Sequence, residues 1–135
     1  HKTSGQMIKG ETDIHYQVVI RNLKTLRTHI ISPGKTLSIT IRNQPRGDVS
    51  IVAVKTTPKQ ALLPTPGKGP GYTVIDDPAD AYGHDFLITL KDHAQITEDG
   101  YVTEGIKVKI GLPIEVEGFD YRVTGSIVDV KAMDD

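Results

Sequence analysis

Two stretches of this chain decide the fold because the second repeats the first. Residues 34–55 read GKTLSITIRNQPRGDVSIVAVK, and residues 111–131 read GLPIEVEGFDYRVTGSIVDVK. They align with a single gap of one residue. In each copy, a leading glycine is followed by alternating apolar residues, a turn and a second apolar run. Self-similarity of this kind points to a repeated structural unit, and the pattern predicts two β-hairpins, with turns around Pro45 and Gly47 and around Asp120.

Each hairpin is preceded by another strand with alternating apolar residues. Tyr16, Val18 and Ile20 lie on one face of the first of these strands, and residues 86–90 repeat the pattern. In the connection after the first strand, the spacing of Leu23, Leu26 and Ile30 favours a single helical turn. The β-branched residues that dominate the strands suit a half-buried pleated surface.

The repeated unit cannot bury its apolar face alone, so two copies must close on each other. We therefore predict an all-β fold: a small closed barrel or curled sandwich of roughly seven or eight strands, built from two pseudo-symmetric strand–connection–hairpin repeats. The second strand of each hairpin should face the shared interior through its valines. These are Val52, Val54, Val128 and Val130.

The chain divides into a short lead, one β domain and a tail. Residues 1–13 are predicted to be disordered or extended, residues 14–131 to form the domain, and residues 132–135 to fray. Within the domain, repeat one covers 14–57 and repeat two covers 84–131. The crossover at 58–83 holds five of the eight prolines and therefore cannot join a central sheet, although residues 72–75 can add a short edge strand.

Composition excludes several classes of protein. The 135 residues carry a formal net charge of -1, with lysine and arginine scattered singly, which argues against a nucleic-acid partner. Cysteine is absent, which removes disulfides, thiolate catalysis and zinc–thiolate sites. No nucleophilic serine lies in an elbow motif and no phosphate-binding loop is present. We therefore expect no catalytic residue and no cofactor.

One acidic segment could hold a hard cation, since carboxylates are the ligands that such ions prefer. Its spacing is not that of an EF-hand loop, and a solvated turn with capping aspartates is the alternative. No metal is assigned on this pattern. The candidate ligands are Asp76, Asp77, Asp80, His84 and Asp85.

Candidate partner-binding residues come from two exposed regions. Arg42 and Arg46 flank the predicted turn of the first hairpin, where they could meet an anionic partner or simply solubilise the turn. Lys68 and Tyr72 belong to the Pro/Gly-rich crossover, a connection long enough to serve a partner.

Three stretches together resemble a family of unknown function, the domain family DUF4330. They are residues 39–47, residues 87–100 and residues 108–130. The proline-rich midsection is similar to the cyanobacterial branch. The resemblance implies a short basic segment and one membrane span before His1. The positive-inside tendency would then place the domain in the periplasm or thylakoid lumen, and the family offers no catalytic residue to carry over.

The leading hypothesis is thus a non-catalytic extracytoplasmic domain of a single-span membrane protein that binds a protein or another envelope component. Two alternatives stay open. Residues 108–118 are similar to the core of bacterial lipid-trafficking domains that form rings, which suggests a lipid-handling module. The segment from Asp76 to Asp85 would instead serve a metal-dependent enzyme.

Overall fold

The computed structural model describes residues 8–58, 60–64, 71–76, 78 and 82–133. The regular elements in these described residues are all strands, which confirms the all-β prediction. The helical turn expected around Leu26 is wrong, since the connection after the first strand is irregular. The strands are β1 Ile8–Lys24, β2 Thr36–Ile41, β3 Gln44–Pro58, β4 Gln60–Pro64, β5 Tyr72–Asp76, β6 Gly83–Thr97, β7 Gly100–Thr103, β8 Ile106–Val108, β9 Pro113–Glu117 and β10 Arg122–Ala132.

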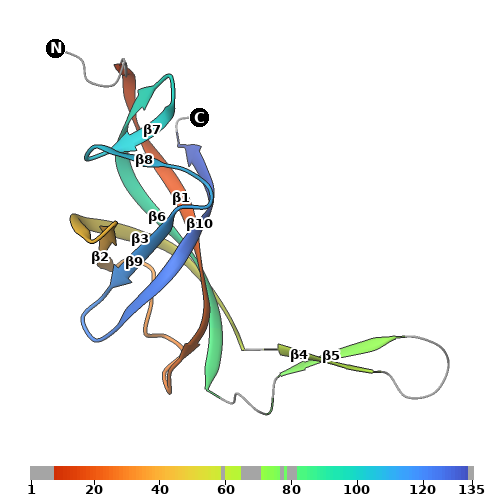
Figure 1. Cartoon of the computed structure of the whole chain (residues 1–135). Coiled ribbons are helices and arrows are strands. Elements are labelled where there is room, and N and C mark those ends of the chain that lie inside the picture. Colours follow the sequence, from red (N-terminus) through yellow and green to blue (C-terminus); the bar gives the residue numbers. More distant parts are fainter. Residues whose placement is uncertain (1–7, 59, 65–70, 77, 79–81, 134–135) are drawn as a thin grey trace.

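Eight of these strands form one antiparallel sheet in the order β1-β10-β9-β2-β3-β6-β7-β8. β1 also pairs with β6, so six strands close into a ring of pairings. The long strands β1 and β6 run side by side along the whole molecule, and β7 and β8 extend the sheet beyond the ring (Figure 1). Closure leaves these six strands without a free edge.

The alternating apolar residues point into the ring, as their period of two requires. The predicted inward faces are confirmed: Tyr16, Val18 and Ile20 are at most 1% exposed, and the matching positions of β6 are also buried. Burying one such side chain contributes about 1.5–3 kcal/mol. The other large side chains that are fully buried are Phe86, Ile14, Ile39, Ile41, Ile88, Leu90, Ile114, Ile127 and Val116.

The two hairpins share their backbone details. Gly34 N–H donates to Ile51 O over 2.9 Å, and Gly111 N–H donates to Ile127 O over 2.7 Å. Both glycines have positive φ, +88° and +99°, a conformation that glycine adopts without a Cβ penalty. The first strands of the hairpins, β2 and β9, pair with each other through Ile39 and Val116.

The turn of the first hairpin differs from the prediction. It consists of Arg42 and Asn43, both with positive φ, rather than Pro45 and Gly47. A two-residue turn of this kind matches the twist of the flanking strands. Pro45 is instead already within β3, and Gly47 lies at a break in the register with β2.

Two of the four valines expected to face the interior do not. The register of β3 with β6 skips Val52, and that of β10 with β1 skips Val128, so both are β-bulge residues. They are 41% and 42% exposed. A bulge adds one residue and reverses the alternation, which returns Val54 and Val130 to half-buried positions against the core.

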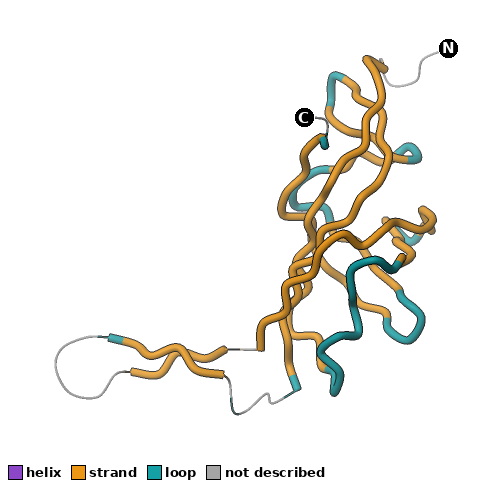
Figure 2. Tube along the Cα trace, turned by 180° about the vertical axis from the view of Figure 1, so that it is seen from behind, coloured by secondary structure: helices purple, strands orange, loops and turns teal. Residues whose placement is uncertain are grey.

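The described part of the crossover forms a separate two-stranded sheet of β4 and β5. This arm projects away from the ring in both views (Figures 1 and 2). The short strand predicted at residues 72–75 is thereby confirmed, as is the exclusion of the crossover from the main sheet. At its ends the sheet reaches further than the predicted domain bounds, since β1 begins at Ile8 and β10 ends at Ala132.

Candidate functional site

The acidic candidates do not come together in the described structure. Asp76 is exposed at the end of β5, and Asp77 and Asp80 lie outside the described residues. Asp85 accepts a hydrogen bond from Asn22 N–H at 2.7 Å, while His84 Nδ1 lies 3.0 Å from Tyr82 O. As neighbours on one strand, His84 and Asp85 point to opposite sides. In the parts of the chain that the structure describes, no group of three histidines or carboxylates suits a metal ion.

The predicted partner-binding residues are also dispersed. Arg42 is exposed in the β2–β3 turn, whereas Arg46 holds the β7–β8 turn by donating to Glu104 O at 3.0 Å. Lys68 lies outside the described residues. Tyr72 opens β5 in the projecting arm, where its backbone pairs with Pro64.

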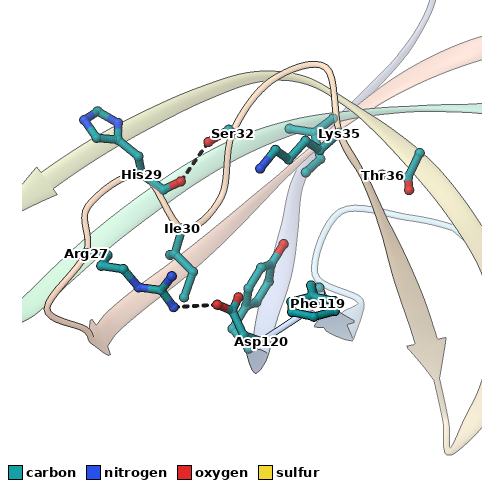
Figure 3. A pocket seen from close by; sticks show the side chains of 11 residues that line it. Arg27, His29, Ile30, Ser32, Lys35, Thr36, Phe119 and Asp120 are labelled. Atoms are coloured by element: carbon teal, nitrogen blue, oxygen red, sulfur yellow. Dashed lines mark hydrogen bonds and ion pairs between the residues drawn. The ribbon is translucent and has the colours of Figure 1, made fainter.

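A different site lies where the β1–β2 connection meets the β9–β10 turn. A cavity of about 300 Å³ opens there, lined mainly by these two loops and the start of β2. Arg27 and Asp120 form an ion pair of 2.6 Å between the loops (Figure 3). The Arg27 guanidinium, by its hydrogen bond, lowers the pKa of Asp120 below the usual value of 3.8. The two loops are therefore in direct contact through an exposed ion pair.

Lys35 supplies a second cation to this cavity. Its ammonium group points into the cavity (Figure 3), and its charge also helps to lower the pKa of Asp120. Within the described residues Lys35 makes no ion pair. The ring of His29 points away from the cavity, and its carbonyl accepts a hydrogen bond from Ser32 Oγ at 2.7 Å. The cavity is thus lined by one guanidinium and one ammonium group, from Arg27 and Lys35, and by one carboxylate, from Asp120.

Large apolar side chains are exposed on the two loops that meet at this cavity and next to the start of β6. Phe119, next to Asp120, is 104% exposed, and Leu26, next to Arg27, is 83% exposed. Tyr82 is 59% exposed and lies beside Leu26, since Thr25 N–H donates to Tyr82 O at 3.0 Å. We call this surface the loop face. It comprises Leu26, Tyr82, Phe119, Arg27 and Lys35.

The loop face occupies one end of the ring. The β1–β2 connection, the β9–β10 turn and the start of β6 all lie at the lower end in Figure 1, and the views agree. The start of β1 and the end of β10 lie at the opposite end. Exposed large apolar groups of this kind mark interaction sites when they gather in one place.

A second charged group lies on the outer surface of β1 and β6. His93 Nε2 is 2.8 Å from Glu11 Oε1, and His93 Nδ1 is 3.0 Å from Asp13 Oδ1. Hydrogen bonds to Glu11 and then to Asp13 raise the pKa of His93 above its usual 6.5, so its stabilising effect is present below pH 6.5 and lost as pH rises through the raised pKa. The carboxylates occupy opposite ring nitrogens, so the trio cannot chelate one ion.

A third polar group lies where β6 meets β7, with Asp92 half-buried and Thr103 buried. Thr103 Oγ1 donates to Asp92 at 3.1 Å, and burial raises the pKa of Asp92. Burial and the nearby Asp92 also raise the pKa of Tyr16, whose hydroxyl has no hydrogen-bond partner in the described structure. Burial thus favours the neutral forms of Asp92 and Tyr16.

None of the loop-face residues is predicted from the sequence as a binding residue. Arg27 and Asp120 are 93 positions apart and meet only through the ring closure. One signal was available: a phenylalanine at the tip of a predicted hairpin turn, where polar residues and glycine are usual.

These features define a class, an all-antiparallel β domain with a ring of six strands and an exposed apolar, basic loop face at one end. The chain belongs to the domain family of unknown function DUF4330, whose model matches residues 1–131. Comparison with curated proteins and with solved structures found no match. In the described residues, no helix is long and apolar enough to cross a membrane.

Proposed function

We propose that this protein is a non-catalytic binding module: the extracytoplasmic domain of a single-span membrane protein of the cyanobacterial branch, in the periplasm or thylakoid lumen. It binds a protein or another envelope component through the loop face. The observation that carries the proposal is the exposure of Phe119 and Leu26 on two loops fixed to each other by the Arg27–Asp120 ion pair. Large apolar side chains exposed on neighbouring loops are typical of an interaction surface.

The position of the loop face supports this layout. β1 begins at the end of the ring opposite the loop face (Figure 1). A membrane anchor that precedes β1 would therefore leave the loop face directed away from the anchoring membrane, where a partner can reach it.

The pairing of strands also supports an origin by duplication, with the ring as a small closed barrel of two pseudo-symmetric repeats. Val18 and Gln17 of β1 pair with Ile127 and Asp129 of β10. Leu90 and Thr89 of β6 pair in the same way with Ile51 and Ala53 of β3. The last strand of each repeat thus pairs with the first strand of the other repeat. Such a scaffold is rigid and leaves the loops at its ends to evolve separately.

The test is photocrosslinking in the native host, with the full-length protein carrying its own upstream sequence. A crosslinking phenylalanine analogue replaces Phe119, and a matched variant carries it at Arg42, the exposed turn of the other hairpin. We expect an adduct at position 119 and none at position 42. External protease should cleave the protein only after the outer envelope is opened.

Two outcomes would overturn the proposal. One is equal labelling, or none, at both positions. The other is catalytic turnover by the purified domain that disappears when His84 or Asp85 is replaced, which would indicate an enzyme.

A further inference from the structure

We propose that the loop face binds the surface of an anionic phospholipid membrane, with Phe119 and Leu26 inserted among the lipids and Lys35 and Arg27 at the phosphate groups. This inference rests on the proposed binding function and names the chemistry of its partner. The lipid surface is one that faces the domain on the side away from the start of β1.

The two apolar side chains protrude far into solvent at the edges of the hollows that they line. Phe119 is fully exposed at the tip of the β9–β10 turn, and Leu26 is 83% exposed on the neighbouring connection. A protein partner would need a pocket shaped for each of these tips. A lipid interface accepts separate protruding apolar side chains without any matching shape, and each gains free energy in proportion to the apolar area it buries.

The charges beside the tips suit phosphate. The ammonium group of Lys35 points into the cavity next to Phe119 (Figure 3) and makes no ion pair with the described residues. The guanidinium of Arg27, the residue after Leu26, pairs with Asp120, the residue after Phe119. Basic side chains directly behind apolar ones form the arrangement that holds a peripheral protein on anionic lipid.

The geometry of the ring keeps this surface presented. Gly118 N–H donates to Tyr121 O at 3.0 Å and closes the turn that carries Phe119. Tyr121 packs against the core, and Arg27 ties the second loop to the same turn. Both tips therefore enter a membrane without first losing the freedom of a disordered loop, which would weaken binding.

The experiment is vesicle sedimentation of the domain with phosphatidylcholine alone and with phosphatidylcholine mixed with phosphatidylglycerol. We expect binding to the mixed vesicles that weakens as salt is added. Phe119→Ala should weaken it by at least about tenfold, since it removes a buried aromatic group. Lys35→Glu should weaken it by about tenfold or more. Ile110→Ala is the matched control, because it removes a side chain that is 67% exposed outside the loop face, and it should have no effect.

The outcomes separate this inference from the broader function. If wild-type protein ignores both kinds of vesicle while position 119 crosslinks to a protein in cells, binding through the loop face stands and the lipid inference is overturned. Vesicle binding that survives both Phe119→Ala and Lys35→Glu would also overturn it. Unchanged thermal unfolding of these exposed variants shows that a loss of binding is not a loss of fold.

Discussion

The β2–β3 and β9–β10 hairpins have the same scaffold and different tips. Both begin at a glycine with positive φ that donates to the isoleucine of the second strand, and both carry a bulge at the following valine. The first hairpin ends in the polar turn Arg42–Asn43, and the second in a turn with the exposed Phe119. The two hairpins therefore share their backbone and differ in the chemistry of their exposed turns.

The largest effect should be common to both hairpins. Ile51→Ala and Ile127→Ala each remove a side chain that is at most 3% exposed. We expect each to lower the free energy of unfolding by about 2–5 kcal/mol, through lost burial and a cavity, as measured by urea denaturation. Widely different changes in the free energy of unfolding would show that the two isoleucines are not equivalent.

A smaller effect should distinguish two strand glycines, Gly125 of the second hairpin and Gly10 of β1. Gly125 lies where β10 approaches β1, and a Cβ there would sit 2.7 Å from both Val18 Cγ1 and Val19 O. We expect Gly125→Ala to cost about 1–3 kcal/mol by overpacking. At Gly10 an added Cβ meets only Ile96 Cδ1 at 3.9 Å, so Gly10→Ala should be nearly neutral. Equal stability of the two variants in urea would contradict the close approach.

The two leading glycines should then respond alike. Gly34→Ala and Gly111→Ala introduce a Cβ into open space but at positive φ, a conformation that costs an ordinary residue about 1–2 kcal/mol. Calorimetry should show similar losses of stability for both. A large loss in one alone would mean that the two turns are not equivalent.

The smallest effect concerns the charge at the second tip. Because the pKa of Asp120 is lowered by Arg27, the ion pair stabilises the fold above pH 3.8, and that contribution is lost as pH falls through the lowered pKa. NMR titration of the Asp120 carboxyl should show a midpoint below 3.8 that rises in Arg27→Gln. The same midpoint in wild type and Arg27→Gln would contradict the contact, and Arg42→Gln at the other tip should leave it unmoved.

Much of the fold follows from the sequence, because alternation records which side of each strand is buried. The alternation of apolar residues alone predicts the inward faces of β1, β2 and β6. The proline content alone predicts that the crossover stays out of the main sheet. The failures are local. A bulge shifts the alternation at Val52 and Val128, and the amino-acid pattern there does not indicate it.

The candidate site could not be predicted from the sequence because it depends on closure of the ring. Arg27 and Asp120 meet only once β10 returns to pair with β1, and neither belongs to a local motif. Two of the predicted site residues also make hydrogen bonds within the fold. Asp85, a candidate metal ligand, accepts from Asn22 N–H, and Arg46, a candidate partner-binding residue, donates to Glu104 O.

The absence of tryptophan from the chain makes one measurement especially direct. A single tryptophan at the second tip, Phe119→Trp, reports on its own surroundings by fluorescence, and Arg42→Trp reports on the other tip. With phosphatidylglycerol-containing vesicles, we expect a blue shift and quenching by brominated acyl chains for Phe119→Trp and neither for Arg42→Trp. No shift in the Phe119→Trp variant, or the same shift in both, would contradict membrane binding through the loop face.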